Sequence, residues 1–426
     1  MEKRKFDELI KSLNNIRFKG MEEIQYGDVL FYSIYYYEKK KWIFELKAVL
    51  APLLRGIYSV ERIGNDGNVF VFSSVYYKRR DHREKFNKVT DLIKNSTVIS
   101  YQKGRYIKNI FNLYKIVKIY LQVKNLDVNF QLKRFISYWI YACVCEQSEI
   151  QEIIDKNNIK MNTLTSYCDV MPIDSMLVQY YKNRRVITIT LQHGQFNTQT
   201  ETGKAAYEKS YSDYFLCFGE YTKSASSNLK IDQTKMIPVG PPEMIRNNMP
   251  SAMKSKYTQC FGVIMSSFEF REENISLIEC ANEFARLFHM KAIIRLHPSL
   301  SFEDYRNHID GDLIEICKNN ESLDQFIDRV DFAIVGNSSV FQTFIFKLVP
   351  IFRYIVNEKT DVYTGIDWCK YSSVTDGIEI IRKYMNDLDM LQTKMLNTRQ
   401  KLIGHGDTEQ NYKEFYKRIQ NEKNIK

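Results

Sequence analysis

Histidine, arginine and serine side chains stand directly after three apolar stretches in the second half of the chain. The segments are Leu191-Gln192-His193-Gly194-Gln195, Arg295-Leu296-His297-Pro298 and Gly336-Asn337-Ser338-Ser339. Imidazole, guanidinium and hydroxyl groups can hold phosphate oxygens, and an imidazole can also transfer a proton. The largely β-branched residues before each segment predict a buried strand, so we expect the segments at the carboxyl ends of strands. Ligands of open α/β sheets bind outside those ends, which predicts a phosphorylated ligand here.

His193 is the first candidate for a catalytic base. Gly194 beside it lets the backbone and a ligand approach each other closely. The ordinary histidine pKa of about 6.5 suits a group that takes a proton from a hydroxyl. A structural histidine that bonds a neighbouring loop is the alternative. The stretch 197–204 is rich in Thr and Gln, is expected to form a loop over the site, and supplies Glu201 as a second candidate base.

Arg295 and His297 are the candidates for binding phosphate. They alternate with Leu296 at strand spacing, so both side chains are expected on one side of the sheet, and Pro298 ends the strand. The planar guanidinium matches phosphate oxygens, and the imidazole adds another donor. In the alternative interpretation, Arg295 pairs with a buried carboxylate.

Asn337, Ser338 and Ser339 stand where a strand gives way to a helix. Free backbone N–H groups and the helix dipole favour an anion there, and serine hydroxyls add donors. Serine is also an ordinary N-cap, which is the structural alternative. Gln342, one helical turn later, can reach a ribose or sugar hydroxyl. Gly240 ends another strand and is a further candidate contact with a nucleotide, although a tight turn would also explain it.

Strand and helix patterns alternate along the chain, which predicts an α/β protein with parallel sheets and helices on both faces. Before residue 240 the expected strands are 28–37, 69–75, 96–100, 163–169, 186–190, 214–218 and 236–239, and the expected helices are 42–55, 104–124, 135–156, 173–184 and 222–229. After residue 250 the expected strands are 261–265, 292–295, 313–316, 332–335 and 349–352, and the expected helices are 272–288, 323–330, 340–347 and 410–422.

A run of prolines divides the chain. Four of the eight prolines lie between Pro238 and Pro250, and because proline breaks both helices and sheet ladders, this run predicts a hinge. The 426 residues are also too many for one compact core. We therefore expect two Rossmann-like domains, residues 1–245 and 246–405, whose parallel sheets face each other across a cleft, and a closing helix over 406–426.

Composition limits the classes of partner and cofactor. The net charge of +10 is spread along the chain without a nucleic-acid-binding motif, so no nucleic-acid partner is expected. The eight cysteines are scattered and form no Cys/His cluster, so we expect no metal and no cofactor. A charged N-terminus and the lack of an apolar stretch long enough to cross a bilayer predict a cytoplasmic protein.

Residues 104–124 have an apolar stripe at helical spacing, with lysines on the remaining surface. Such a helix can lie on an anionic membrane, although it more often packs its apolar stripe on its own domain. Both interpretations are open. The first would place the protein peripherally at the inner face of the plasma membrane.

Several motifs together resemble those of bacterial GT-B glycosyltransferases of surface and capsular polysaccharide assembly. They are the Leu-Gln-His-Gly turn, the Phe-Gly and Pro-Val-Gly-Pro-Pro strand ends, Arg-Leu-His-Pro and Asn-Ser-Ser, within residues 160–355. The most similar groups are the CDP-glycerol glycerophosphotransferase-like and polysialyltransferase-like proteins. The resemblance implies a GT-B-like fold with an N-terminal acceptor-side domain and a C-terminal domain that binds the nucleotide donor.

By the same resemblance, His297, Ser338 and Ser339 stand at positions that contact donor phosphates in those families. The chain departs from the families in two ways. Gln342 and Thr343 stand where many GT-B enzymes carry a carboxylate for the donor ribose, and the acidic-acidic-Gly motif of the polysialyltransferases is absent. These departures leave the identity of the donor and of the base open.

The resemblance implies metal-independent transfer from a nucleotide-sugar or CDP-polyol donor to a glycan or lipid-linked glycan acceptor. The first alternative is a nucleotide-sugar epimerase of the same fold, which needs carboxylates around the sugar that the sequence does not place. The second is a GT-B-like scaffold subunit of a polysaccharide assembly complex, without catalysis. The presence of His193, Arg295 and His297 argues against that scaffold.

Overall fold

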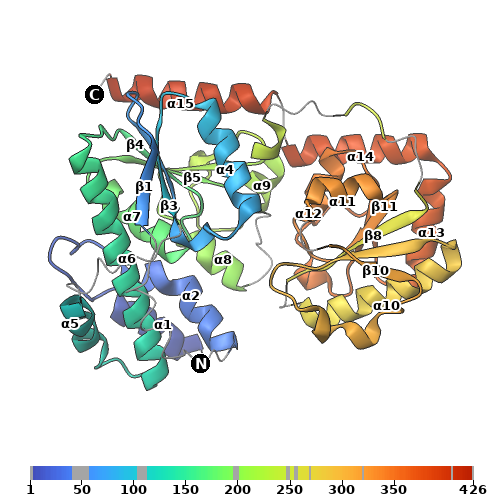
Figure 1. Ribbon diagram of the computed structural model, residues 1–426, viewed down its shortest axis with the longest axis horizontal. Helices are drawn as coiled ribbons and strands as arrows, with labels where there is room; N and C mark the ends of the chain where they lie inside the picture. Colours follow the sequence, from blue (N-terminus) through green and yellow to red (C-terminus); the bar gives the residue numbers. More distant parts are fainter. Residues whose placement is uncertain are drawn as a thin grey trace.

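The computed structural model describes residues 3–40, 57–102, 113–194, 201–245, 250–253, 258–267, 270–318, 321–403 and 406–424. Within these ranges the chain forms two sheets, each covered by helices on both faces (Figure 1). The predicted helix 42–55 and the first half of the predicted helix 104–124 lie outside the described residues.

The first sheet has seven strands in the order β1-β3-β2-β4-β5-β6-β7, all parallel except for β1, which pairs antiparallel with β3. Its strands are β1 (Ile57–Arg62), β2 (Asn68–Phe72), β3 (Thr97–Gln102), β4 (Thr163–Ser166), β5 (Ile187–Leu191), β6 (Tyr214–Cys217) and β7 (Met236–Pro238). The helices around it are α1 (Lys3–Leu13), α2 (Tyr26–Lys40), α4 (Arg80–Leu92), α5 (Leu113–Val123), α6 (Phe130–Lys156), α7 (Pro172–Lys182), α8 (Glu201–Glu208), α9 (Glu220–Ala225) and α15 (Thr408–Asn424).

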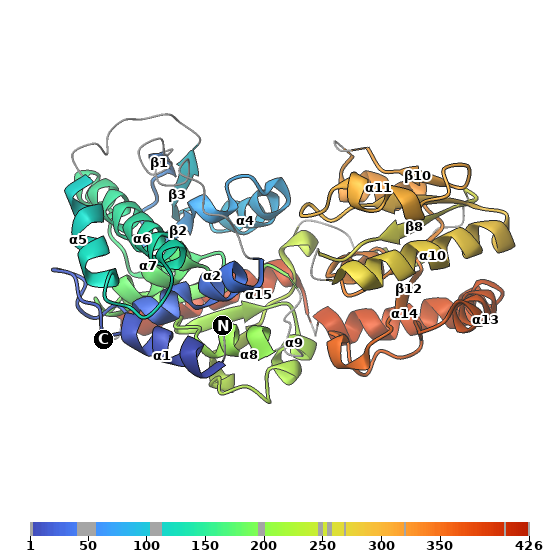
Figure 2. The same ribbon diagram turned by 90° about the horizontal axis from the view of Figure 1, so that it is seen from below.

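The alternation of side chains along β2 explains why this strand is apolar throughout. Val69 and Val71 belong to a core shared with α2, α6 and α7, whereas Phe70 and Phe72 belong to a second core shared with α4 and α15. Successive strand residues point to opposite faces, and here both faces are covered by helices. The last helix, α15, lies along the first sheet (Figures 1 and 2).

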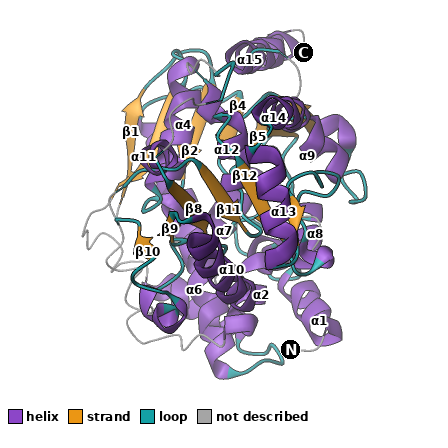
Figure 3. Cartoon of the chain, turned by 90° about the vertical axis from the view of Figure 1, so that its right-hand side faces the viewer, coloured by secondary structure: helices purple, strands orange, loops and turns teal. Residues whose placement is uncertain are grey.

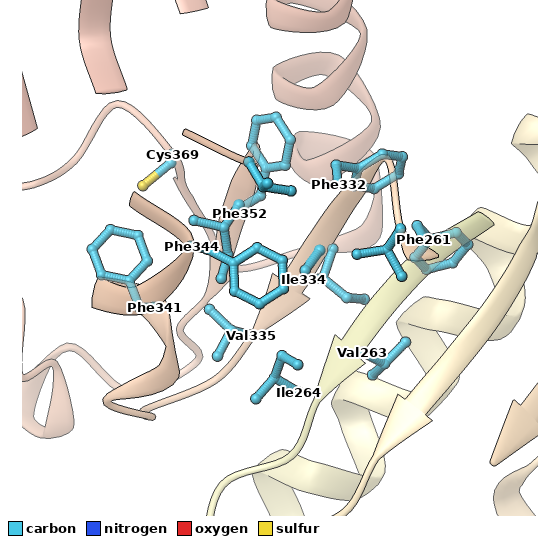
Figure 4. Packing of buried hydrophobic residues seen from close by; sticks show 14 of the residues in the cluster. Phe261, Val263, Ile264, Phe332, Ile334, Val335, Phe341, Phe344, Phe352 and Cys369 are labelled. Carbon is cyan, nitrogen blue, oxygen red and sulfur yellow. The ribbon is translucent and has the colours of Figure 1, made fainter. Parts of the chain in front are cut away.

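The second sheet has six parallel strands in the order β10-β9-β8-β11-β12-β13. They are β8 (Cys260–Ile264), β9 (Lys291–Arg295), β10 (Ile314–Ile316), β11 (Phe332–Val335), β12 (Ile351–Tyr354) and β13 (Lys370–Tyr371). Its helices are α10 (Arg271–Phe288), α11 (Leu323–Arg329), α12 (Val340–Phe346), α13 (Val374–Met385) and α14 (Leu388–Ile403), which flank the strands in Figure 3. Aromatic side chains fill the core, where Phe261 and Phe332 stack with ring centroids 5.2 Å apart (Figure 4).

The chain passes between the two sheets twice, through residues 239–259 and 404–407. The predicted domain limits fall in these two connections, and the limits themselves stay a prediction. Contacts made by α9 help to tie the two parts of the chain together. Gly219 at the start of α9 has no room for a Cβ, which would lie 2.3 Å from the Leu402 carbonyl oxygen. The Tyr221 hydroxyl donates to the carbonyl oxygens of Val362 and Thr364 at 3.2 and 3.3 Å.

The predicted strand 28–37 is wrong, because these residues lie within the helix α2. The segment is rich in Val, Ile, Phe and Tyr, and this composition favours a strand. Its fully buried side chains nevertheless recur at helical spacing, as at Tyr26, Val29, Leu30 and Ile34. Packing of this apolar face against α1, α6 and α7 therefore decides the conformation.

The other predicted strands overlap observed ones, and the predicted helices overlap observed helices wherever the chain is described. The sequence patterns missed the strands β1 and β13 and the helices α1, α4, α8, α13 and α14. The stretch 201–204, expected to form part of a loop, is instead the first turn of α8. Within the described ranges, no helix combines the length and the apolar character that crossing a membrane requires.

Candidate phosphate-binding site

The turn after β5 and the turn after β11 lie opposite each other, although they belong to different sheets. A Cβ built on Gly194 would lie 4.0 Å from Ser339 Oγ, which is ordinary van der Waals contact. Two of the three segments singled out in the sequence therefore meet where the carboxyl edges of the sheets face each other. Glycine at position 194 keeps the space between them open.

Gln192 fixes the shape of the first turn. Its side chain is 2% exposed and donates through Nε2 to the Gly194 carbonyl oxygen at 2.8 Å. Its Oε1 accepts the Phe218 N–H at 2.7 Å, and its own N–H donates to the Leu216 carbonyl oxygen at 3.0 Å. The turn that carries His193 is thus bound to the end of β6, which holds the imidazole in place.

His193 is surrounded by aromatic rings. The ring centroids of His82, Tyr167 and Tyr76 lie 5.9, 6.1 and 6.2 Å from its own, and Cys168 Sγ lies 3.9 Å from its Nε2. Burial, followed by the positive charges of nearby lysine and arginine side chains, lowers the pKa of His193 to about 4. At neutral pH this imidazole is therefore uncharged and can accept a proton.

His297, in the second sheet, faces the helix α4 of the first. Burial and the charge of Arg79 lower the pKa of His297 to about 4, and Asp81 opposes them. Its Nδ1 accepts the Ser299 N–H at 3.2 Å and lies 2.8 Å from Ser299 Oγ. The proton of the neutral ring is therefore on Nε2, which leaves an N–H donor for a phosphate oxygen.

Arg79 is the cation common to this site, and the sequence reasoning missed it. Its guanidinium makes two hydrogen bonds to the Asp81 carboxylate, at 2.9 and 2.7 Å, and lies 3.0 Å from His82 Nε2. Its charge lowers the pKa values of His82, His193 and His297. The start of α4 therefore brings positive charge to neutral imidazoles from both sheets.

A signal for this segment was present in the sequence. The charged run Lys78–Lys85 follows the strand β2 closely, just as the other three segments follow β5, β9 and β11. The strand-end rule applied to this strand would have found Arg79 and Lys85. Such a charged run is more typical of the solvent-exposed surface of a helix, and Arg80 in α4 is indeed exposed.

Arg295 has different neighbours from His297. Its Nη1 donates to the Glu321 carbonyl oxygen at 3.0 Å and to Cys317 Sγ at 3.4 Å, and its guanidinium lies over the Phe326 ring. Strand β9 ends at Arg295, so the strand alternation behind the predicted common orientation does not extend to His297. These hydrogen-bond partners are a carbonyl and a thiol rather than the buried carboxylate of the alternative interpretation. The role of Arg295 in phosphate binding stays a prediction.

Ser338 and Ser339 have different surroundings. Ser338 Oγ accepts the Val340 N–H at 3.3 Å, and the Ser338 carbonyl oxygen accepts from the Tyr363 hydroxyl at 3.4 Å. Ser339 is exposed, makes no capping hydrogen bond, and presents its hydroxyl toward Gly194. Ser338 thus shapes the turn, whereas the Ser339 hydroxyl remains available to a ligand.

A buried ion pair stabilises the loop that contacts the turn after β11. The Arg353 guanidinium is 0% exposed, pairs with Asp361, and donates to the carbonyl oxygens of Tyr363 and Ile366 at 3.0 Å each. These bonds fix the loop that follows β12. The Tyr363 hydroxyl reaches Ser338 from that loop, so Arg353 positions the turn without contacting a ligand.

The remaining candidates are placed less favourably for contact with a ligand. Gln342 is 3% exposed in α12 and lies in the interior. Gly240 has a φ of +98°, and a Cβ there would lie 2.2 Å from Thr408 Oγ1, so its nearest neighbour is the start of α15. Asn337 is partly buried directly before the serines. Glu201 is the first residue of α8, and its side chain is not among those the structure describes.

Among the described residues, no three or more His, Cys, Asp or Glu side chains gather in a way that could hold a metal ion. The expected independence from metals and cofactors stays a prediction. The eight cysteines are free thiols.

Comparison with known proteins shows the fold. No protein-family model and no curated protein matches the sequence. A UDP-GlcNAc 2-epimerase from Neisseria meningitidis, bound to UDP-GlcNAc, is similar in structure, with a TM-score of 0.53 and 13% identity over 82% of this chain and 99% of that one. The S. aureus MnaA–UDP structure has a TM-score of 0.52 and 10% identity, over 83% of this chain and 97% of that one. The glycotransferase of kitacinnamycin has a TM-score of 0.51 and 9% identity, over 84% and 100% of the two chains.

At these identities the likeness concerns the fold alone. The chain has two mainly parallel α/β sheets arranged in a GT-B-like fold, as the sequence predicted. Similarity to the CDP-glycerol glycerophosphotransferase-like and polysialyltransferase-like groups rests on the sequence motifs.

Proposed function

We propose that the chain is a GT-B glycosyltransferase, or a close relative that transfers a polyol phosphate. Its donor would be a nucleotide-sugar or CDP-polyol, and its acceptor a glycan or lipid-linked glycan of a bacterial surface polysaccharide. The observation that carries the proposal is the meeting of the His193-Gly194 and Ser338-Ser339 turns from two sheets. The similar structures that contain UDP or UDP-GlcNAc make UDP the first nucleotide to test.

The donor phosphates would bind between the second sheet and α4. His297 offers Nε2–H, Ser339 offers its hydroxyl, and Arg79 contributes positive charge. In sugar transfer, the acceptor oxygen bonds to the anomeric carbon as the bond from that carbon to the donor phosphate breaks. The negative charge that develops on the departing nucleotide is then stabilised by these donors.

His193 would take the proton from the acceptor hydroxyl. With a pKa of about 4 in the free protein, it is a weak base. A bound diphosphate next to Arg79 and Lys85 offsets the two charges that lower this pKa, and so raises it. Donor binding would therefore strengthen the base, and the empty protein would activate water poorly.

A nucleotide-sugar epimerase remains the second candidate, and one observation favours it. That reaction needs carboxylates near the sugar, and Asp81 lies close enough to His297 to oppose the lowering of its pKa. The sequence alone had not placed a carboxylate here. An epimerase would change the donor without an acceptor, which separates the two candidates experimentally.

The cellular setting is part of the proposal. The sequence motifs support a role in capsule or surface polysaccharide synthesis. A cytoplasmic position at the inner face of the plasma membrane would bring the site to lipid-linked acceptors.

Nucleotide binding is the first test. Thermal melting of the purified protein with UDP, CDP, CMP, GDP, ADP or TDP should show stabilisation by one of them, by about 2.7 kcal/mol at a hundred times its dissociation constant. His297→Ala should lose this stabilisation, and Arg295→Ala shows whether that arginine contributes. His308→Ala, in a turn away from the site, is the control. Stabilisation by none of the nucleotides would favour the scaffold alternative.

Product analysis is the second test. With the matching nucleotide-sugar alone, an epimerase yields the epimer, whereas a transferase yields at most slow hydrolysis. Addition of a glycan acceptor should then give a longer glycan and free nucleotide. Epimer without acceptor, lost in Asp81→Asn, would overturn the transferase proposal and support the alternative.

A further inference from the structure

Helix α5 has two apolar faces, and only one of them is buried. Ile119 and Val123 are 2% and 0% exposed and pack on the core beside α6. On the opposite face, Tyr114, Val117 and Leu121 recur at helical spacing and are 55%, 56% and 50% exposed. Packing on its own domain, one of the two interpretations of this segment, therefore explains the face with Ile119 and Val123. It does not explain the exposed face.

Another exposed aromatic side chain stands at the start of the next helix. Phe130, the first residue of α6, is 58% exposed. The Lys133 ammonium group donates to the Lys124 carbonyl oxygen at 2.7 Å, which holds the first turn of α6 against the end of α5. Nine large hydrophobic side chains are exposed in the described part of the chain, and four of them lie between Tyr114 and Phe130. The exposed large hydrophobic side chains are therefore concentrated in one stretch of the chain, 114–130.

Cations surround these side chains. The segment from Tyr114 to Arg134 carries five basic residues and one acidic residue, namely Lys115, Lys118, Lys124, Lys133, Arg134 and Asp127. The Lys118 ammonium lies 5.3 Å from the Tyr114 ring centroid, and the Arg134 guanidinium lies 5.5 Å from that of Phe130. Apolar side chains flanked by lysines are the pattern of a helix that lies in the headgroup region of an anionic membrane.

We infer that this face, made of Tyr114, Val117, Leu121, Phe130 and the surrounding cations, binds the surface of a membrane rich in anionic phospholipids. The side chains would enter the boundary between headgroups and acyl chains while the lysines contact lipid phosphates. Four side chains that are half exposed offer roughly 400 Å², less than the ~800 Å² that each partner of a stable dimer buries. A lipid surface needs no such complementary area, and its charge matches this face.

The position of α5 fits this inference. In two perpendicular views it lies beside α6 at the outer end of the first domain, far from the second sheet (Figures 1 and 2). Membrane contact at α5 would leave the candidate phosphate-binding site uncovered. The inference rests on one part of the proposed function, the position at the inner face of the plasma membrane, and names the residues that would hold the chain there. Vesicle binding is measured without nucleotide, so membrane binding can fail while the proposed transfer reaction holds, and the reverse.

The test is co-sedimentation of the full chain with vesicles. Vesicles of phosphatidylcholine mixed with phosphatidylglycerol should bind the wild type at low salt, and phosphatidylcholine alone should bind it at least tenfold more weakly. Each lysine near the membrane surface contributes about fivefold to binding. Lys118→Ala with Lys124→Ala should therefore lower the partition coefficient roughly 25-fold. Val117→Ser with Leu121→Ser should lower it more than tenfold at low and at high salt.

Matched variants control for general effects. Leu287→Ser with Val356→Ser removes side chains that are 46% and 53% exposed elsewhere, and should leave vesicle binding unchanged. Lys401→Ala with Lys417→Ala is the equivalent control for charge. Tyr114→Trp adds a direct reporter, whose emission should shift to the blue on anionic vesicles.

Three results would overturn the inference. They are no binding of the wild type to anionic vesicles, equal binding by Val117→Ser with Leu121→Ser, and no change in the emission of Tyr114→Trp. A wild-type dimer that separates in the serine variant, without vesicle binding, would assign the face to a second copy of the chain instead.

Discussion

Three histidines from two sheets share Arg79 as a charged neighbour. Each has a lowered pKa, with burial as the first cause, and each is therefore neutral when the site is empty. Neutral rings beside an arginine and a lysine form a site with positive charge that a phosphate would offset. The residues thus favour an anion before any ligand is identified.

The pKa values themselves are testable by NMR. His193 and His297 should titrate near pH 4, far below the ordinary value of about 6.5. Arg79→Ala removes a lowering charge from both rings, so both pKa values should rise. Arg80→Ala, an exposed neighbour that pairs with Glu84, is the control. Unchanged titration of both rings in Arg79→Ala would show that the arginine is not close to them.

A buried carboxyl in α7, beside the first sheet, predicts an effect of pH on stability. Asp174 is 0% exposed, accepts from Ser73 Oγ at 2.6 Å and from the Tyr167 N–H at 3.2 Å, and burial raises its pKa to about 7. The folded state therefore keeps the proton after the unfolded chain has lost it, and stability decreases as pH rises from about 4 to about 7. Asp174→Asn removes this loss while keeping an acceptor for Tyr167.

The melting temperature of Asp174→Asn relative to the wild type should therefore rise from pH 4 to pH 7 and then level off. Asp174→Ala is the comparison. It leaves the Tyr167 N–H without its acceptor and should be less stable than Asp174→Asn by about 1–3 kcal/mol. A difference between the Asp174→Asn variant and the wild type that does not change with pH would contradict the raised pKa.

The positions of some candidate site residues were predictable from the sequence. His193, His297 and Ser339 follow apolar strands, and the strand-end rule places such residues at one edge of a sheet. The rule does not predict which of these side chains will instead bond to, or be buried against, neighbouring parts of the protein. Arg295 is engaged by the connection after β10 and Gln342 is buried in α12, and neither fact can be inferred from spacing alone.

Substitution of Gly240 can distinguish a role in the tight turn after β7 from a contact with the nucleotide. Its φ is +98°, and a Cβ there would lie 2.2 Å from Thr408 Oγ1. Gly240→Ala should therefore cost about 2 kcal/mol or more while nucleotide stabilisation is retained. Gly406 has a similar φ of +91° with 3.4 Å of clearance, so Gly406→Ala is the control and should cost less. Loss of nucleotide binding without loss of stability would instead support a contact with the nucleotide.

Elements were predictable where the pattern was long and its period was clear. The strands of the second sheet and the helix α10 are examples, since continuous apolar runs between turns favour buried parallel strands. The segment 28–37 failed because its aromatic and β-branched residues satisfy both periods, and only contacts with α1, α6 and α7 select the helix. The short amphipathic helix α4 was missed because its first turn is almost entirely charged.

The last helix of the chain, α15, packs on the first sheet, although the helix before it belongs to the second. Phe415 is 4% exposed in the core with Phe70, and its ring lies 5.4 Å from that of Tyr214. Phe415→Ala should therefore lower the free energy of unfolding by about 3–5 kcal/mol, mainly in the part of the chain around the first sheet. Hydrogen exchange should increase in β4–β6 and remain slow in β8–β12, with the exposed Lys417→Ala as control. Equal loss of protection in both sheets would contradict this assignment.

We propose that the donor phosphates bind between the two sheets, and calorimetric titration of the donor nucleotide can show whether residues from both sheets contribute. Affinity should fall at least tenfold in Arg79→Ala, on the first sheet's side, and in His297→Ala, on the second's. It should be unchanged in Arg80→Ala and His308→Ala. Full affinity in Arg79→Ala with loss in His297→Ala would confine the site to the side of the second sheet and overturn the proposal of a shared site.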